Sequence, residues 1–160
     1  MAIGKSAMAS PNYKASISVS ADVDVAYAAI THGIEHWWTK PDTPIRRLGD
    51  RAKFTFPPGR SYWTFEAIEL TPPNQVKLKC VDALHLHEGQ PEEIEQEWLG
   101  TVTQWHISKE GAGSRIELEH HGLKPELLCF DICKAGWDFF FLISLKAYLD
   151  TGTGRPHLTS

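Results

Sequence analysis

His120 is the residue whose type and position in the sequence most favour acid–base chemistry. It falls on the apolar face of a strand predicted over residues 114–121. A buried imidazole can orient a ligand or move a proton when a carboxylate lies beside it. Glu66 points inward if Ile68 does, and Asp82 follows an apolar strand face, so we expect one of these carboxylates to form the polar end of an interior pocket with His120. The alternative is a core histidine whose ring nitrogens are satisfied by hydrogen bonds to the backbone.

Two pairs of metal-ligating side chains also appear in the sequence. His85 and His87 are two residues apart near a predicted strand end, and Cys129 and Cys133 fall on one face of a predicted helix. A zinc site needs three or four converging ligands, and neither pair supplies that number alone. We therefore expect no metal site and no cofactor, with both cysteines acting as small core residues.

The sequence offers no nucleophile with the local motif that would activate it. No Gly-x-Ser-x-Gly elbow is present. Cys80 lies in the middle of a predicted strand on an apolar face, where a thiol stays protonated and inert. The glycine pairs at 111–113 and 152–154 fall at a predicted hairpin and a predicted helix end, and neither forms a phosphate-binding loop. The sequence therefore defines no catalytic residue, and we lean against an enzyme.

Composition indicates one globular domain. The chain has 160 residues, of which 42% are hydrophobic and 22% charged, with a net charge of -4. No basic stripe marks a nucleic-acid partner, and the longest apolar run, residues 139–145, is too short to span a membrane. The odd count of three cysteines favours reduced thiols in the cytoplasm. We expect a disordered lead-in over residues 1–13 and a single domain over residues 14–156.

The hydrophobic pattern predicts an α+β fold. Alternating apolar residues indicate strands, and a three- to four-residue period indicates a long helix near the C-terminus. Consecutive strands joined by short turns form an antiparallel meander, and only the long helix could cover one face of it. The predicted strands are 14–20, 51–56, 62–70, 75–83, 97–107 and 114–121; the predicted helices are 23–33, 34–38 and 126–150, and residues 84–96 are a solvated loop.

Aromatic residues are unusually placed for a chain of this size, since many fall on the inward faces of these elements. Rings on strand and helix faces that point at one volume can line a pocket for a small molecule. We expect Trp37 and Trp38 at the pocket mouth. We expect Trp63 and Trp98 on the outer face of the sheet, where they would mark a partner site or the contact of a weak homodimer. The predicted ligand-binding residues are Trp38, Phe54, Phe56, Glu66, Ile68, Leu78, Trp105, His120, Trp137, Phe141 and Leu145.

Four segments resemble the bacterial branch of the Hsp-ninety ATPase activator family, which belongs to the START-like, or SRPBCC, superfamily. They are 34–39 (IEHWWT), 65–73 (FEAIELTPP), 114–120 (SRIELEH) and the run from Gly136 to Gly152, and their order and spacing extend over residues 15–156. The resemblance implies a helix-grip fold, in which a curved antiparallel sheet with two short helices after its first strand holds a long C-terminal helix, and it implies a cavity. It implies no reaction, because the superfamily includes carriers, cyclases, ring-hydroxylase subunits and co-chaperone domains.

These observations favour a cytoplasmic protein that binds a small apolar or aromatic molecule between the sheet and the C-terminal helix. Two other classes of protein stay open. One is a cyclase- or hydrolase-like enzyme that uses His120 with a carboxylate, and the other is a module that interacts with a chaperone.

Overall fold

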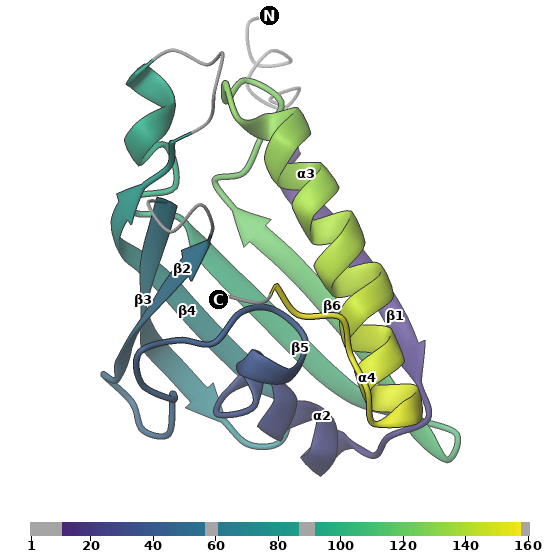
Figure 1. The fold of residues 1–160 in the computed structure, drawn as a ribbon. Coiled ribbons are helices and arrows are strands. Elements are labelled where there is room, and N and C mark those ends of the chain that lie inside the picture. The colour runs from purple at the N-terminus through teal and green to yellow at the C-terminus, as the bar shows by residue number, and fades with distance from the viewer. Residues whose placement is uncertain (1–10, 57–60, 87–91, 158–160) are drawn as a thin grey trace, which may run out of the picture.

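The computed structural model describes residues 11–56, 61–86 and 92–157 of the chain (Figure 1). The strands are β1 (Tyr13–Val19), β2 (Arg51–Phe56), β3 (Ser61–Thr71), β4 (Gln75–Leu84), β5 (Val102–Glu110) and β6 (Gly113–His121). The helices are α2 (Val23–Ile30), α3 (Phe130–Phe139) and α4 (Lys146–Thr151), together with the short 3-10 segments η1 (Ile34–His36) and η2 (Glu92–Gln96) and the π-helical segment η3 (Phe140–Leu145). Residues 1–10 of the predicted lead-in lie outside the described residues, and its last residue, Tyr13, begins β1.

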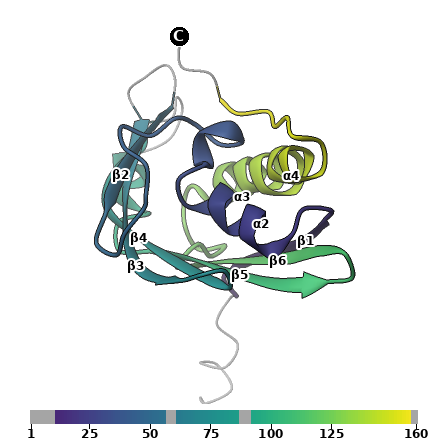
Figure 2. The ribbon, with the colours of Figure 1, turned by 90° about the horizontal axis from the view of Figure 1, so that it is seen from below.

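The six strands form one antiparallel sheet in the order β1-β6-β5-β4-β3-β2. Strands β2 to β6 make the predicted meander, and β1 pairs with β6 along the far edge, where Ile17 lies opposite Ile116. The sheet curves around the helices, as Figure 2 shows from below. One face of an antiparallel sheet can thus be buried while the other meets water.

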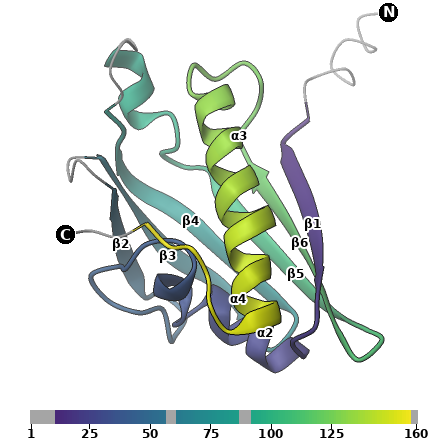
Figure 3. The same ribbon diagram turned by 45° about the vertical axis from the view of Figure 1, so that its right-hand side comes forward.

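The C-terminal helical run covers the concave face of the sheet and crosses its strands diagonally (Figure 3). Trp137, Phe141 and Leu145 are buried at four-residue intervals along this run. The prediction of one helix over 126–150 needs two corrections. The helix begins at Phe130, after a turn whose backbone N–H groups at Leu128 and Cys129 are capped by a carboxylate, and its middle, η3, is π-helical.

Two β-bulges between β3 and β4 change which side chains face the helix. Ala67 pairs with Leu78 but Glu69 pairs with Lys77, so Ile68 is an extra residue on β3. A bulge adds one residue to one strand and so reverses the alternation beyond it. Ile68 continues the outward-facing, even-numbered positions of β3 and is 41% exposed, so the prediction that it faces the interior is wrong.

The same geometry corrects the predicted orientation of both carboxylates. On β3 the buried side chains are the odd-numbered residues from 61 to 67, so Glu66 lies on the outer face, where its carboxylate forms a 2.9 Å ion pair with Arg51. On β4 the second bulge falls at Val81, because Thr64 pairs with Asp82 and Phe65 with Cys80. Asp82 is therefore turned outward and exposed.

Two further segments differ from the sequence-based expectation. Strand β5 begins at Val102, so residues 97–101 form a turn instead of the start of a strand. In the predicted solvated loop, His85 and Ile94 are buried, and residues 87–91 lie outside the described residues. Among the described helices, none has the length and apolar character needed to cross a membrane.

Candidate functional site

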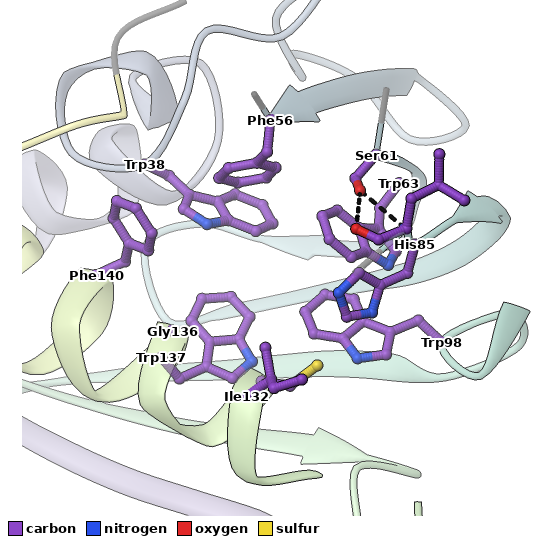
Figure 4. Close-up of a pocket in the computed structure, with 12 residues that line it drawn as sticks. Trp38, Phe56, Ser61, Trp63, His85, Trp98, Ile132, Gly136, Trp137 and Phe140 are labelled. Atoms are coloured by element: carbon purple, nitrogen blue, oxygen red, sulfur yellow. Dashed lines mark hydrogen bonds between the residues drawn. The ribbon is translucent and has the colours of Figure 1, made fainter. Parts of the chain in front are cut away.

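A pocket of about 200 Å³ lies between the start of α3 and the ends of β2, β3 and β4. Its wall is mostly aromatic, and four of the six tryptophans of the chain contribute to it. Figure 4 shows Trp38 and Phe140 on one side of the space, with Trp63, His85 and Trp98 on the other. The lining residues are Trp38, Phe56, Ser61, Trp63, His85, Leu86, Trp98, Ile132, Cys133, Gly136, Trp137 and Phe140.

Trp137 joins the other three pocket tryptophans into one surface. Its ring stacks on Trp38 with 5.2 Å between centroids and on Trp98 with 6.2 Å. Trp98 packs in turn against Trp63 at 4.9 Å. Connected rings of this kind give a rigid apolar wall with π faces on which a planar molecule can stack.

Only a few polar groups interrupt this wall. The Ser61 hydroxyl accepts a 2.9 Å hydrogen bond from the backbone N–H of Leu86 and donates one of 3.1 Å to its carbonyl, which fixes the chain beyond β4 against β3. The indole N–H of Trp63 is buried and has no acceptor among the described residues. Because an unpaired buried donor costs free energy, a molecule that accepts a hydrogen bond at this position would be favoured.

The structure separates the predicted ligand-binding residues into three groups. Trp38, Phe56 and Trp137 line the pocket. Glu66 and Ile68 lie on the outer face of the sheet, as described above. The remaining six are buried in the core, some of them directly behind the pocket wall: Phe54, Leu78, Trp105, His120, Phe141 and Leu145.

His120 is a fully buried core histidine with both ring nitrogens satisfied. Its Nδ1 accepts a 3.1 Å hydrogen bond from the indole N–H of Trp137, so Nε2 carries the proton and donates to Thr101 Oγ1 at 2.9 Å. Burial, with a smaller contribution from the neighbouring His121, lowers the pKa of His120 to about 3. The prediction of a His120–carboxylate pair is wrong, since Glu66 and Asp82 face away from it.

Trp63 and Trp98 were predicted on the outer face of the sheet and instead line the pocket, with 8% and 5% of their surface exposed. They therefore do not mark a dimer contact. The alternation of Trp63, Phe65 and Ala67 with polar residues could have revealed the inward face of β3. For Trp98, the signal was Gly100, whose positive φ of 86° places it in a turn.

Trp37, predicted at the mouth, is fully buried and donates its indole N–H to Ala29 O at 2.8 Å.

The cysteines fall in two places. Cys80 is buried in β4, and burial raises the pKa of its thiol to about 12, in agreement with the inert thiol that we expected. Cys129 and Cys133, at the start of α3, lie beside His85, and the ligand atoms of these three residues are within 4.8 Å of one another. The two pairs seen in the sequence thus contribute to one cluster, while His87 lies outside the described residues.

Comparison with known proteins identifies the fold. No protein-family model and no curated protein matches the sequence. Solved structures do match: the solution structure of the Aha1 dimer from Colwellia psychrerythraea is 23% identical, with 89% of this chain and 98% of that chain covered and a TM-score of 0.70. DynU16, a protein in the dynemicin biosynthetic locus, is 20% identical over 88% of this chain and 48% of its own, with a TM-score of 0.65. Protein CV1439 from Chromobacterium violaceum is 17% identical over 88% and 97%, with a TM-score of 0.64.

The chain therefore has an α+β helix-grip fold, which it shares with these solved structures. The fold is like that of the Aha1 dimer, in agreement with the fold that the resemblance of the four sequence segments implied. Identities of this size establish the architecture, whereas the chemistry of the chain has to be argued from its own site.

Proposed function

We propose that the protein binds a small aromatic molecule that carries a hydrogen-bond acceptor. The observation that supports this most is the aromatic pocket itself, in which four tryptophans surround an apolar space next to the unpaired indole N–H of Trp63. The rings offer stacking faces, and the N–H offers one directed contact that would fix the orientation of a bound molecule.

The size of the pocket limits the ligand to about one substituted ring. A dry cavity of roughly 150 Å³ is enough for benzene, and this pocket measures about 200 Å³. A single aromatic ring buries about 200 Å² of apolar surface, which at ~25 cal/mol per Å² contributes about 5 kcal/mol. The dissociation constant should therefore lie between about 0.1 mM and about 1 mM.

The two alternative functions have less support. An enzyme that uses His120 with a carboxylate has less support, because both ring nitrogens of His120 are hydrogen-bonded, to Trp137 and Thr101, and neither partner is a carboxylate. A chaperone-interacting module would gain support if the pocket bound none of the probes described below. The weak homodimer stays a prediction that sedimentation velocity can test, now without the tryptophans that first suggested it.

Filling the pocket from Gly136 should abolish binding without unfolding the protein. A Cβ atom built at Gly136 meets no atom within 4 Å, and the residue lines the pocket from within α3. We expect Gly136→Leu to weaken the binding of acetophenone and ethylbenzene at least about 10-fold, while the better helix propensity keeps the melting temperature at or above that of the wild type. Titrations followed by N–H correlation NMR give both dissociation constants.

Gly136→Ala is the matched control, since it adds a single methyl group and should retain binding with about 0.5–1 kcal/mol of added stability. Equal binding by the wild type and the leucine variant would show that the probes bind elsewhere and would contradict the proposal.

The acceptor requirement can be tested with the same two probes, which have similar rings and differ by a carbonyl group. Trp63→Phe keeps an aromatic ring at this position and removes the N–H. Because a net hydrogen bond contributes about 0.5–1.5 kcal/mol, the variant should bind acetophenone about 3- to 10-fold more weakly and ethylbenzene about equally. If the variant bound both probes more weakly by the same factor, or bound both as tightly as the wild type, the proposed hydrogen bond would be contradicted.

A further inference from the structure

Three side chains with soft or borderline metal-binding atoms meet at one end of the pocket. His85 follows the last residue of β4 and is held in place by its backbone N–H, which donates to Glu95 O at 2.9 Å. Cys129 precedes the first residue of α3, and Cys133 lies one turn further on. The imidazole and both sulfur atoms lie within 4.8 Å of one another, and all three residues are buried.

The spacing of the two cysteines suits a bridging ion better than a disulfide. The backbone N–H of Cys133 donates to Cys129 O at 2.8 Å, so the two residues are one helical turn apart. Side chains at this separation have Cβ atoms about 5–6 Å apart, whereas a disulfide needs about 3.5–4.5 Å. Two sulfurs on a tetrahedral zinc ion, with Zn–S near 2.3 Å, are about 3.8 Å apart, which the observed cluster can reach by small side-chain rotations.

The surroundings of the cluster favour a thiolate on Cys129. Cys129 lies at the N-terminus of the ten-residue α3, where the helix dipole stabilises negative charge. The thiol of Cys133 donates a hydrogen bond to the Cys129 sulfur; this contact, with a smaller contribution from His85, lowers the pKa of Cys129 and raises that of Cys133. Glu97 fixes the turn by accepting hydrogen bonds of 2.8 and 2.9 Å from the backbone N–H groups of Leu128 and Cys129.

We infer that His85, Cys129 and Cys133 form a zinc site with a fourth coordination position open to the aromatic pocket. Two thiolates and one imidazole are a ligand set that zinc prefers, and three protein ligands are typical of zinc sites that keep one position for water or a bound molecule. The open position faces the pocket because His85 and Cys133 both line it, and the pocket also provides the entry path for the ion. The site holds zinc whether or not the pocket binds an organic molecule.

The test is metal binding by the full-length protein after dialysis against a chelator. Titration with zinc against a chromophoric competitor should give one ion per chain, confirmed by native mass spectrometry. Titration with cobalt should give the intense near-ultraviolet absorption of thiolate-to-cobalt charge transfer together with the visible bands of a tetrahedral ion. A wild-type protein that takes up no zinc, or whose cobalt form lacks thiolate absorption, would overturn the site.

Variants of the cluster distinguish this site from adventitious binding. Cys133→Ser and His85→Gln should each weaken zinc binding at least about 100-fold, which exceeds the loss usual for residues outside the coordination sphere. Cys80→Ala is the matched control, because it removes the third buried thiol, outside the cluster, and should leave stoichiometry and absorption unchanged. Circular dichroism of each metal-free variant checks its fold. Zinc affinity that survives both cluster variants would place the ion elsewhere and overturn the proposal.

Discussion

Trp137→Ala should lower the free energy of unfolding by about 3–5 kcal/mol, the usual cost of truncating a buried tryptophan. Trp137 is 2% exposed, and its ring contacts Trp38 and Trp98 by stacking and Trp105 edge-on at 5.7 Å. The substitution also removes the donor that His120 Nδ1 accepts from. Urea unfolding followed by circular dichroism measures the loss as a fall in the midpoint at an unchanged slope.

Trp137→Phe separates the contribution of the hydrogen bond from that of the aromatic ring, and Leu48→Ala is a control at an exposed position. Trp137→Phe keeps an aromatic ring and should cost about 1–3 kcal/mol, mainly because it leaves a buried acceptor on His120 unpaired. Leu48→Ala, at a side chain that is 67% exposed, should stay within about 0.5 kcal/mol of the wild type. If Trp137→Ala lowered the free energy of unfolding by less than about 1.5 kcal/mol, the packing of Trp137 against the neighbouring tryptophans would not be a main source of stability.

The protein should also lose stability as the pH falls below about 6.5, through His120. The folded-state pKa of this histidine is lowered from its ordinary value of 6.5 to about 3, chiefly by burial. Between these two values the unfolded chain binds a proton that the folded chain excludes, so the free energy of unfolding falls as the pH falls. Over the whole interval the loss approaches ~5 kcal/mol.

His120→Gln should flatten this pH dependence, because an amide can accept from Trp137 and donate to Thr101 without titrating. Asp50, Asp138 and Asp150 have lowered pKa values, so their effect on stability is confined to about pH 4 and below. Unfolding measured between about pH 7 and 4.5 therefore excludes these carboxylates, and the difference between the wild type and His120→Gln in this range isolates the histidine. His106→Gln, at an exposed position, is the control that should change nothing. Equal slopes in the wild type and His120→Gln would contradict the buried neutral histidine.

Local pattern was sufficient for most of the fold. Alternation located the strands because each has one wet and one dry face, and Asp22 marked the start of α2, where its carboxylate accepts from the N–H of Val25 at 3.0 Å. What the pattern could not show was where alternation reverses. The bulges at Ile68 and Val81 depend on pairing between β3 and β4. The inward face of β3 was inferred from Ile68, near the C-terminal end of the strand, and the orientation of Glu66 was therefore predicted wrongly.

The site was less accessible to sequence reasoning because it is assembled from separate elements. Trp38, Phe56 and Trp137 could be predicted, since each follows the period of its own segment. His85 and Cys133 are 48 positions apart, and their proximity arises only when the end of β4 meets the start of α3. The same holds for Trp98, which reaches the pocket from a turn that has no period.

The most direct test of the proposed function is a search for nuclear Overhauser effects between acetophenone and the protein at saturating probe. We expect contacts from the ring protons of the probe to the indole protons of Trp38, Trp63, Trp98 and Trp137, with the carbonyl end nearest the Trp63 N–H. Contacts confined to exposed side chains such as Leu48 or Ile68, or no contacts at all, would contradict a ligand-binding pocket between the sheet and the C-terminal helix.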